Sequence, residues 1–311
     1  MRRLADAFRS LPPILQAALL MIVGAICVAI QNGMIRVVSA EVHSFEVVFF
    51  RNVFGLFAML PFMGGLRLDL FRARRPSRLL MMSVAHVGGM LCYFAAIAYL
   101  PLAEVVALAF SKPLFATVGA ALVLHEVVRA RRWSAIGIGF VGVLIVLRPG
   151  AQTISPFALV VLLGALLAAA TTLMIKHLTR TERVPIIICY QALFATLLSF
   201  PLCLLHWRMP DLAGWLLLIG IGGFGTLAWL TLAQAVYLAD ASAVVPFEFL
   251  RLPFAALVAY LWFGEVPSVW TWLGGGLIFG STIYITQREA RIARQQRLAA
   301  AAEGARPLTS P

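Results

Sequence analysis

The chain has 311 residues, of which 62% are hydrophobic and only 12% are charged, and its mean hydropathy is +0.94. Soluble domains carry about a quarter charged residues, so this composition excludes a soluble globular protein and predicts an integral membrane protein. The net charge is +12, but the basic residues lie in short clusters between apolar runs. Nucleic-acid binding is therefore not predicted, because it needs basic side chains gathered on one exposed face.

Ten apolar stretches are long enough to cross a membrane, for which about 20 mostly apolar residues are needed. Six contain no Asp, Glu, Lys or Arg: 10–35, 79–103, 149–175, 184–207, 212–239 and 266–287. Four more contain or adjoin a charge: roughly 44–66, 104–124, 133–148 and 241–263. These runs predict an all-α membrane protein with ten transmembrane helices. The alternating segments of about ten residues that are typical of a β-barrel are not seen.

The two ends of the chain are predicted to differ. The first apolar run is too long for the hydrophobic region of a cleaved signal peptide, and no clear small-x-small site ends it, so we predict a first helix there. After Gln287 the chain is charged, then Ala-rich, and finally contains proline. This part predicts a short cytoplasmic helix that frays toward the C-terminus.

The orientation follows from the distribution of Lys and Arg, which are enriched in cytoplasmic segments. With ten helices and a cytoplasmic N-terminus, 19 of the 25 basic residues fall in cytoplasmic segments, three in helices and three on the opposite side. The three on the opposite side are Arg36, Arg148 and Arg208. Both termini are therefore predicted to be cytoplasmic, in a multi-pass protein of a bacterial inner membrane.

The chain resembles itself at a shift of about 140 residues. The ordered matches are Met34-Ile35-Arg36 with Met174-Ile175-Lys176, Phe54 with Phe194, Pro61 with Pro201, Lys112 with Arg251, Glu126 with Glu265, and Trp133 with Trp272. We therefore predict a first repeat over 1–148, a second over 149–287 and a tail over 288–311. Each repeat has five helices, an odd number, so the second enters the membrane from the opposite side. Such inverted repeats are common in secondary transporters, with the substrate site near the midplane between the halves.

Three segments carry a resemblance to a known family: HSFEVVFFRNVFGLFAMLPF (43–62), AYLPLAEVVALAFSKPLFATVGAALVLHE (98–126) and RRWSAIGIGFVGVLIVLRPG (131–150). With the two five-helix halves, they resemble the EamA-type members of the drug/metabolite transporter superfamily over nearly the whole chain. HSFEVVFFR and SKPLFATVGAALVLHE are most similar to the branch that contains S-adenosylmethionine uptake transporters. The resemblance implies a transporter, with a cargo that this branch does not define.

Four charged residues inside predicted helices are the first candidates for the substrate site, because a charge near the bilayer centre costs about 2.5–3.5 kcal/mol. They are Arg51, Lys112, Glu248 and Arg251. Glu248 and Arg251 are three residues apart and share a helix face, so they either hold the ninth helix in register or face the substrate. The second interpretation is favoured because Lys112 occupies the matching place in the first repeat. Arg51 either snorkels to the interface, pairs with a carboxylate such as Glu46, or meets an anionic substrate.

Uncharged and aromatic residues complete the predicted site. His86 and Tyr93 are seven residues apart and share one helix face. His86 is expected either to relay protons or to be a hydrogen-bonded structural residue. Tyr93 and Trp229 offer ring faces for stacking, although a lipid-facing or packed position is the commoner fate of an aromatic side chain here. Gln191 is a polar candidate for the cavity or for a helix–helix hydrogen bond.

Several other residues are predicted to be structural. Glu126 and Glu265 precede the fifth and tenth helices and are expected to cap or pin loops. Seven glycines are expected to let the fifth and tenth helices pack closely, away from the cavity: Gly137, Gly139, Gly142, Gly274, Gly275, Gly276 and Gly280. Cys27, Cys92, Cys189 and Cys203 lie in apolar runs without CxxC or CxxH spacing, which predicts free thiols and no metal site.

The function predicted is secondary transport of a small organic metabolite by alternating access. No Walker A motif is present, so ATP is not the direct energy source. S-adenosylmethionine-like cargo matches the branch resemblance, while riboflavin uptake and export of amino acids or related metabolites stay open. An intramembrane enzyme is disfavoured because no GxSxG or HExxH motif occurs. The expected partners are the lipid bilayer and the substrate, with no cofactor and no nucleic acid, and a homodimer is left open.

Overall fold

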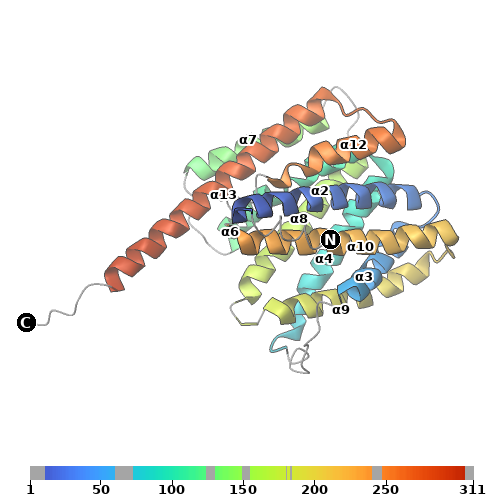
Figure 1. The fold of residues 1–311 in the computed structure, drawn as a ribbon, viewed down its shortest axis with the longest axis horizontal. Helices are drawn as coiled ribbons and strands as arrows, with labels where there is room; N and C mark the ends of the chain where they lie inside the picture. Colours follow the sequence, from blue (N-terminus) through green and yellow to red (C-terminus); the bar gives the residue numbers. More distant parts are fainter. Residues whose placement is uncertain are drawn as a thin grey trace, which may run out of the picture.

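The computed structural model describes residues 11–59, 73–123, 130–148, 155–179, 181–182, 184–239 and 247–304. Within these ranges the chain is helical and forms ten spans, as the apolar runs predict (Figure 1). The first five are α2 (Pro13–Val38), α3 (Ser44–Met59), α4 (Pro76–Tyr99), the pair α5 (Leu102–Ala109) and α6 (Lys112–Val123), and α7 (Ala130–Leu147). The second five are α8 (Pro156–Leu178), α9 (Val184–Leu205), α10 (Leu212–Leu238), α12 (Arg251–Phe263) and α13 (Val269–Gly304).

The helix ends follow local sequence signals. Pro13, Pro76 and Pro156 each stand at the first helical position, where the missing N–H has no intrahelical partner to lose. Asp211 caps α10 by accepting a 2.6 Å hydrogen bond from the Gly214 amide. Gly264 ends α12 with φ of +66°, a left-handed conformation that glycine adopts without strain.

The helices are suited to a membrane. Among the described residues, six are long and apolar enough to cross one, and three further apolar helices are shorter. Large apolar side chains such as Leu216, Leu261 and Leu144 are exposed on the outside of the bundle. A helix that is apolar all round is typical of a membrane span. The chain is therefore a multi-pass membrane protein.

The packing of the helices follows the internal repeat. The most extensive pairs are α2 with α10, α4 with α8, and α7 with α13. In the order of the spans, α2 corresponds to α8, α4 to α10 and α7 to α13. The contact of α2 with α10 is therefore equivalent to that of α8 with α4, and the contact of α7 with α13 is equivalent to itself. In Figure 1, α2 and α10 run side by side through the bundle, and α13 packs along α7 before it extends beyond the other helices. This symmetry of contacts, with five spans in each half, agrees with a duplicated five-helix unit.

Close contacts between helices are made at equivalent glycines. A Cβ on Gly24 would lie 2.6 Å from Thr231 Oγ1 of α10, and a Cβ on Gly164 would lie 3.0 Å from Cys92 Cβ of α4. Gly24 and Gly164 are 140 positions apart, which is the period of the repeat. Small residues allow membrane helices to approach each other closely, so the repeat preserves the same packing device in both halves.

The fourth span, for which the sequence predicts a helix over roughly 104–124 with a kink at Pro113, is interrupted. α5 ends at Ala109 and α6 begins at Lys112, with Phe110 and Ser111 between them. The cause is Pro113, which has no N–H to donate and whose ring clashes with the carbonyl four residues earlier, that of Ala109. In the second repeat α12 begins at Arg251, the residue that matches Lys112, and Pro253 follows it.

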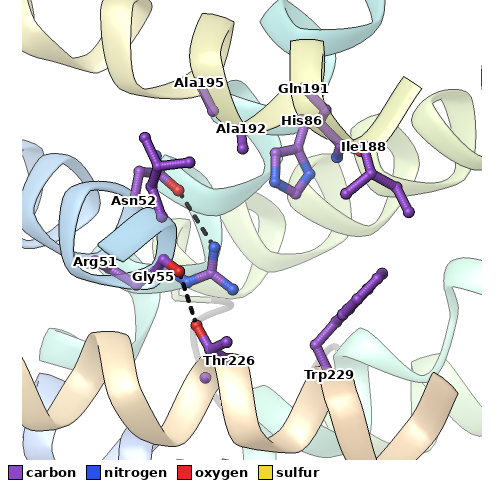
Figure 2. Close-up of a pocket in the computed structure, with 12 residues that line it drawn as sticks. Arg51, Asn52, Gly55, His86, Ile188, Gln191, Ala192, Ala195, Thr226 and Trp229 are labelled. Carbon is purple, nitrogen blue, oxygen red and sulfur yellow. Dashed lines mark hydrogen bonds between the residues drawn. The ribbon is translucent and has the colours of Figure 1, made fainter. Parts of the chain in front are cut away.

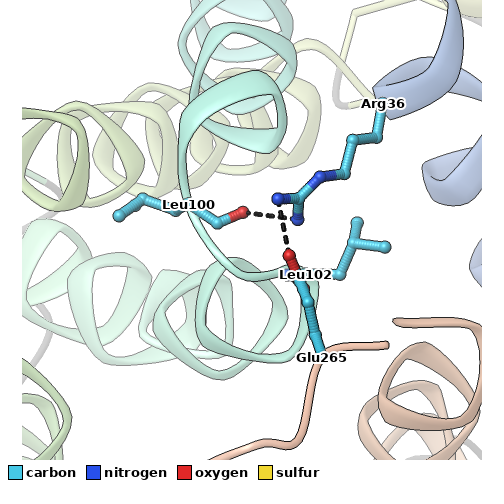
Figure 3. A network of polar contacts seen from close by, with 4 residues as sticks. All are labelled: Arg36, Leu100, Leu102 and Glu265. Carbon is cyan, nitrogen blue, oxygen red and sulfur yellow. Dashed lines mark hydrogen bonds and ion pairs between the residues drawn. The ribbon is translucent and has the colours of Figure 1, made fainter. Parts of the chain in front are cut away.

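One end of the bundle is held by a polar network that joins the two repeats (Figure 3). Arg36 Nη2 lies 2.5 Å from Glu265 Oε1, and Arg36 Nη1 donates to the Leu100 carbonyl at 3.1 Å. Glu265 Oε2 accepts from the Leu102 amide at 3.3 Å. Glu265 thus pins the loop before α5, which confirms the structural role predicted for it. Glu126, its counterpart in the first repeat, lies outside the described residues.

The glycines of α7 and α13 divide into two sets. Gly139, Gly142, Gly274 and Gly275 contact neighbouring helices closely, as predicted. A Cβ on Gly137, Gly276 or Gly280 would meet nothing within 4 Å. The prediction of close packing therefore holds for one face of this helix pair and is wrong for these three positions.

Candidate functional site

A cavity of about 140 Å³ lies inside the bundle, between α3, α4, α9 and α10 (Figure 2). Both repeats contribute to it, two helices each. Its lining residues are Arg51, Asn52, Gly55, Leu56, His86, Ile188, Gln191, Ala192, Ala195, Gly225, Thr226 and Trp229. The volume is below the 300–1,000 Å³ typical of small-molecule pockets, so a metabolite would fill it only after the helices move apart.

Arg51 is the charged residue of this cavity. It lies in the middle of α3, and its Nη1 donates a 3.2 Å hydrogen bond to Asn52 Oδ1. The Glu46 carboxylate, one of the partners considered for Arg51, accepts a 3.0 Å hydrogen bond from the Arg208 amide. A guanidinium has five N–H donors, so the bond to Asn52 leaves donor capacity for a ligand.

Three other side chains face the same space from different helices. Figure 2 shows the His86 ring from α4, the Trp229 ring from α10 and Gln191 from α9 around the Arg51 guanidinium. Imidazole and amide groups both donate and accept hydrogen bonds, and the indole offers a flat apolar face. These side chains suit a planar ligand whose edge carries both donors and acceptors.

Close packing of α3 against α10 positions Arg51 opposite Trp229. A Cβ on Gly222 would lie 2.5 Å from Phe54 Cβ, so only glycine allows this approach. Thr226 Oγ1 lies 3.3 Å from the Gly55 carbonyl and donates at 2.9 Å to the Gly222 carbonyl. The two helices, one from each repeat, are thus fixed side by side along the wall of the cavity.

A second polar group contains the remaining charged residues predicted for the site. Arg251 Nη2 lies 3.6 Å from Glu248 Oε1, which confirms the expected pairing within the ninth span. Both side chains are about one-third exposed, although they lie in a membrane-spanning region. Lys112 is exposed at the start of α6 and interacts electrostatically with both of them. Among the described residues, two cations and one carboxylate therefore share this region, which we term the charge cluster (Lys112, Glu248 and Arg251).

The charge cluster is connected to the cavity by polar residues of α4. His86 interacts electrostatically with both Arg51 and Lys112. Tyr93 interacts with Arg251, and its hydroxyl accepts a 3.0 Å hydrogen bond from Asn32 Nδ2 of α2. His86 and Tyr93 thus each interact with charged residues predicted for the site.

The predicted residues therefore fall into two neighbouring groups. Arg51, His86, Gln191 and Trp229 line the cavity, whereas Tyr93, Lys112, Glu248 and Arg251 do not line it. Sequence reasoning missed Asn52, Gly55, Leu56, Ile188, Ala192, Ala195, Gly225 and Thr226. Asn52 could have been identified from the sequence, because it is a polar residue beside Arg51 in an apolar run. The alanines and glycines gave none, because small residues in membrane helices are common whatever they face.

The described residues show no group of three His, Cys, Asp or Glu side chains that could hold a metal ion. All four cysteines are free, as predicted, and Cys27, Cys189 and Cys203 are buried among apolar side chains. The side chains that line the cavity offer hydrogen bonding, ion pairing and aromatic stacking.

Comparison with known proteins places both halves of the chain in one family. Residues 15–148 and 155–287 each match the model of the EamA-like transporter family. A riboflavin transporter of Vibrio cholerae is 34% identical over 288 residues, 91% of this chain and 97% of that protein. An S-adenosylmethionine uptake transporter of Rickettsia bellii is 29% identical, over 83% and 89%. A pseudopaline exporter, CntI, of Pseudomonas aeruginosa is 30% identical, over 86% and 95%.

A solved crystal structure has the same fold. Its TM-score is 0.59, at 16% sequence identity, and the match covers 90% of this chain and 98% of that chain. At this identity the likeness concerns the arrangement of the helices only. It extends across both repeats.

Proposed function

Because this chain belongs to the EamA-like transporter family, and is a secondary transporter and not an enzyme, we propose that its cargo is riboflavin or a closely related flavin. The observation that carries this proposal is the character of the cavity. One guanidinium, two carboxamides and an imidazole surround a space that Trp229 borders. These groups suit a neutral planar ring with a polar edge.

The chemistry of the isoalloxazine ring fits these groups. Its pyrimidine edge carries two carbonyl oxygens and one N–H, so Arg51 would donate to a carbonyl and Gln191 would both donate and accept. The flat ring would stack against Trp229, since aromatic pairs gain about 0.5–1.5 kcal/mol beyond the area that they bury. The 34% identity to the Vibrio cholerae riboflavin transporter supports the same cargo.

The charge cluster is proposed to complete the site. Lys112 and Arg251 each begin a helix segment, α6 and α12, and the N-terminus of a helix carries a partial positive charge. Hydroxyl or acidic groups at the far end of a cargo would accept hydrogen bonds there. Tyr93 would contribute its hydroxyl. In this arrangement Glu248 neutralises one of the two cations while the site is empty.

S-adenosylmethionine is the second candidate, supported by the 29% identity to the Rickettsia bellii transporter and by Glu248. This cargo carries a sulfonium and an ammonium group, which favour a carboxylate nearby. Arg51 is the charged residue among the described lining of the cavity, and no carboxylate lines it there. A net positive site repels a cation, so the geometry favours the flavin.

We also propose the orientation given by the basic residues, with both termini cytoplasmic and the Arg36–Glu265 network on the periplasmic side. The cavity would then open alternately to the two sides as the repeats move against each other, around a site near the midplane. The division into 1–148, 149–287 and the tail 288–311 is kept as the outline of the two moving units.

The cargo is tested by uptake into proteoliposomes that contain the purified protein. Radiolabelled riboflavin and radiolabelled S-adenosylmethionine are assayed in parallel, with protein-free liposomes as the control. The proposal predicts saturable riboflavin uptake that unlabelled riboflavin abolishes, and S-adenosylmethionine uptake at the level of the control. Saturable S-adenosylmethionine uptake that Glu248→Gln abolishes, without riboflavin uptake, would replace the first candidate by the second.

A further inference from the structure

A second cavity lies on the outside of the bundle, away from the proposed cargo site. It has a volume of about 450 Å³ and runs between α7 and α13. We term it the α7–α13 groove. Its lining residues are Ser134, Ala135, Ile138, Gly276, Leu277, Gly280, Ser281 and Tyr284.

The groove exists because glycines form its floor. α7 and α13 are held together on their other face, where a Cβ on Gly274 would lie 2.5 Å from the Gly142 carbonyl oxygen. On the groove side, a Cβ on Gly276 or Gly280 would meet nothing within 4 Å. Ile138 and Leu277 are exposed at its sides. In a membrane this narrow apolar channel faces lipid hydrocarbon.

One end of the groove carries exposed aromatic residues of the kind found at membrane–water interfaces. Trp133 and Tyr284, both exposed there, are the residue types enriched at membrane–water interfaces. Beyond this end of the groove, each of the two helices has a basic residue at a position on the same helix face. Arg131 is three residues before Ser134 on α7, and Arg288 is four residues after Tyr284 on α13. Positions at these spacings share a helix face, and the orientation proposed above puts both basic residues in cytoplasmic segments next to this end of the groove.

We propose that the α7–α13 groove binds one acyl chain of an anionic phospholipid, whose headgroup lies at the end marked by Trp133, Tyr284 and the basic positions. The charge is complementary, since clusters of Lys and Arg beside membrane helices attract anionic headgroups. Neutral lipid would gain the acyl contact alone. The proposal concerns a structural lipid and does not depend on the cargo.

A second copy of the chain is the competing occupant, because Gly276 and Gly280 form a GxxxG pattern of the kind that membrane helix dimers use. A two-fold pair through this face would put the basic positions 131 and 288 of both copies on the same side of the membrane. That gathering of like charge opposes dimer formation and favours an anionic ligand. The lipid is therefore the occupant that the charges favour.

The test uses the full-length protein, washed free of lipid in detergent and then given an equimolar mixture of phosphatidylglycerol and phosphatidylcholine. Native mass spectrometry counts the lipids retained and the copies of the chain. Gly280→Leu fills the groove. Gly223→Leu is the matched control, because Gly223 also lies in a helix and a Cβ there meets nothing within 4 Å. Arg131→Gln with Arg288→Gln removes the two basic positions that share a face with the groove and leaves the groove open.

The proposal predicts that the natural chain and Gly223→Leu retain one phosphatidylglycerol in preference to phosphatidylcholine by about tenfold. Gly280→Leu should lose that lipid, and its melting temperature should equal that of the Gly223→Leu control. The double arginine variant should retain both lipids equally. Equal retention of phosphatidylglycerol by Gly280→Leu and the natural chain would overturn the proposal. A dimer that Gly280→Leu dissociates would assign the groove to a second copy instead.

Discussion

Arg36 and Glu265 come from opposite repeats and form an ion pair that also holds the loop between α4 and α5. Each side chain is about one-fifth exposed, so the pair is shielded from water without being buried. Arg36 contributes the end of the first span, and Glu265 the connection before the last. The network therefore joins the two units that are proposed to move during transport.

Replacing both Arg36 and Glu265 should lower the free energy of unfolding by less than the sum of the losses caused by the two single substitutions. A double-mutant cycle of Arg36→Met and Glu265→Gln should give a coupling free energy of about 1 kcal/mol, the upper part of the range for partly exposed pairs. Unfolding in mixed micelles measures it. Arg208→Met combined with Glu265→Gln is the control and should be additive. A coupling near zero in the first cycle would mean that the pair does not hold the repeats together.

Two neighbouring glycines of α13 should respond oppositely to alanine. Gly274→Ala should cost roughly 1–3 kcal/mol of unfolding free energy, because its Cβ would meet the Gly142 carbonyl at 2.5 Å. Gly276→Ala should be neutral or stabilising by up to about 1 kcal/mol, because the methyl group enters open space and alanine favours a helix. Thermal melts in detergent compare the two. Equal destabilisation would show that the packing of α7 against α13 differs from that described.

Trp229 should contribute to cargo binding and not to stability. Trp229→Ala should raise the KM for riboflavin by roughly fivefold or more, since stacking of a flat ring on an aromatic side chain contributes ~1–3 kcal/mol. Trp229→Phe should retain most of the affinity. Trp272→Ala serves as the control, because both indoles are 40% exposed and Trp272 lies outside the cavity. A similar KM in the two alanine variants would remove Trp229 from the site.

His43 should make the stability depend on pH. Its ring stacks on His206 at 4.3 Å in the connection before α3. Burial, and then the charge of His206, lower the pKa of His43 below its usual 6.5. The folded state thus binds this proton less readily than the unfolded state, so stability is present above pH 6.5 and is lost as the pH falls toward the lowered pKa.

The measurement is the melting temperature as a function of pH. The natural chain should melt at progressively lower temperature as the pH falls below 6.5, and His43→Gln should flatten this decrease. His177→Gln is the control, since His177 lies near Arg78 in a different part of the molecule. An unchanged slope in His43→Gln would assign the pH dependence to other groups.

The sequence predicted the ten spans, the duplication and four residues of the cavity from simple physical signals. Arg51 and His86 stand out because ionisable groups are rare in membrane helices. The sequence predicts only a kink before Lys112. Pro113 implies that one backbone hydrogen bond is lost, but it does not define how many residues leave the helix. The contact between Gly222 and Phe54 could not be predicted, because the faces that α3 and α10 turn toward each other depend on how the whole bundle packs.

The open faces of Gly276 and Gly280 also could not be foreseen. A glycine in a membrane helix has the same sequence signature whether it contacts another helix or leaves a groove. The ion pair of Arg36 with Glu265 was half predicted: the repeat marked Glu265 as structural, but Arg36 was assigned only to a side of the membrane. Contacts between the two repeats can be identified only once the three-dimensional arrangement of the helices is known.

The most direct test of the central claim, that the Arg51 cavity is the cargo site, is riboflavin uptake by proteoliposomes containing the natural chain, Arg51→Gln or Arg208→Gln. Arg208 is the control because its side chain is exposed, while its contact with Glu46 uses the backbone amide that glutamine keeps. Arg51→Gln should lower kcat/KM by at least about tenfold, since hydrogen bonds from a charged donor contribute ~1.5–3 kcal/mol. Arg208→Gln should transport at the natural rate. Uptake by Arg51→Gln with the natural kcat and KM would contradict the account.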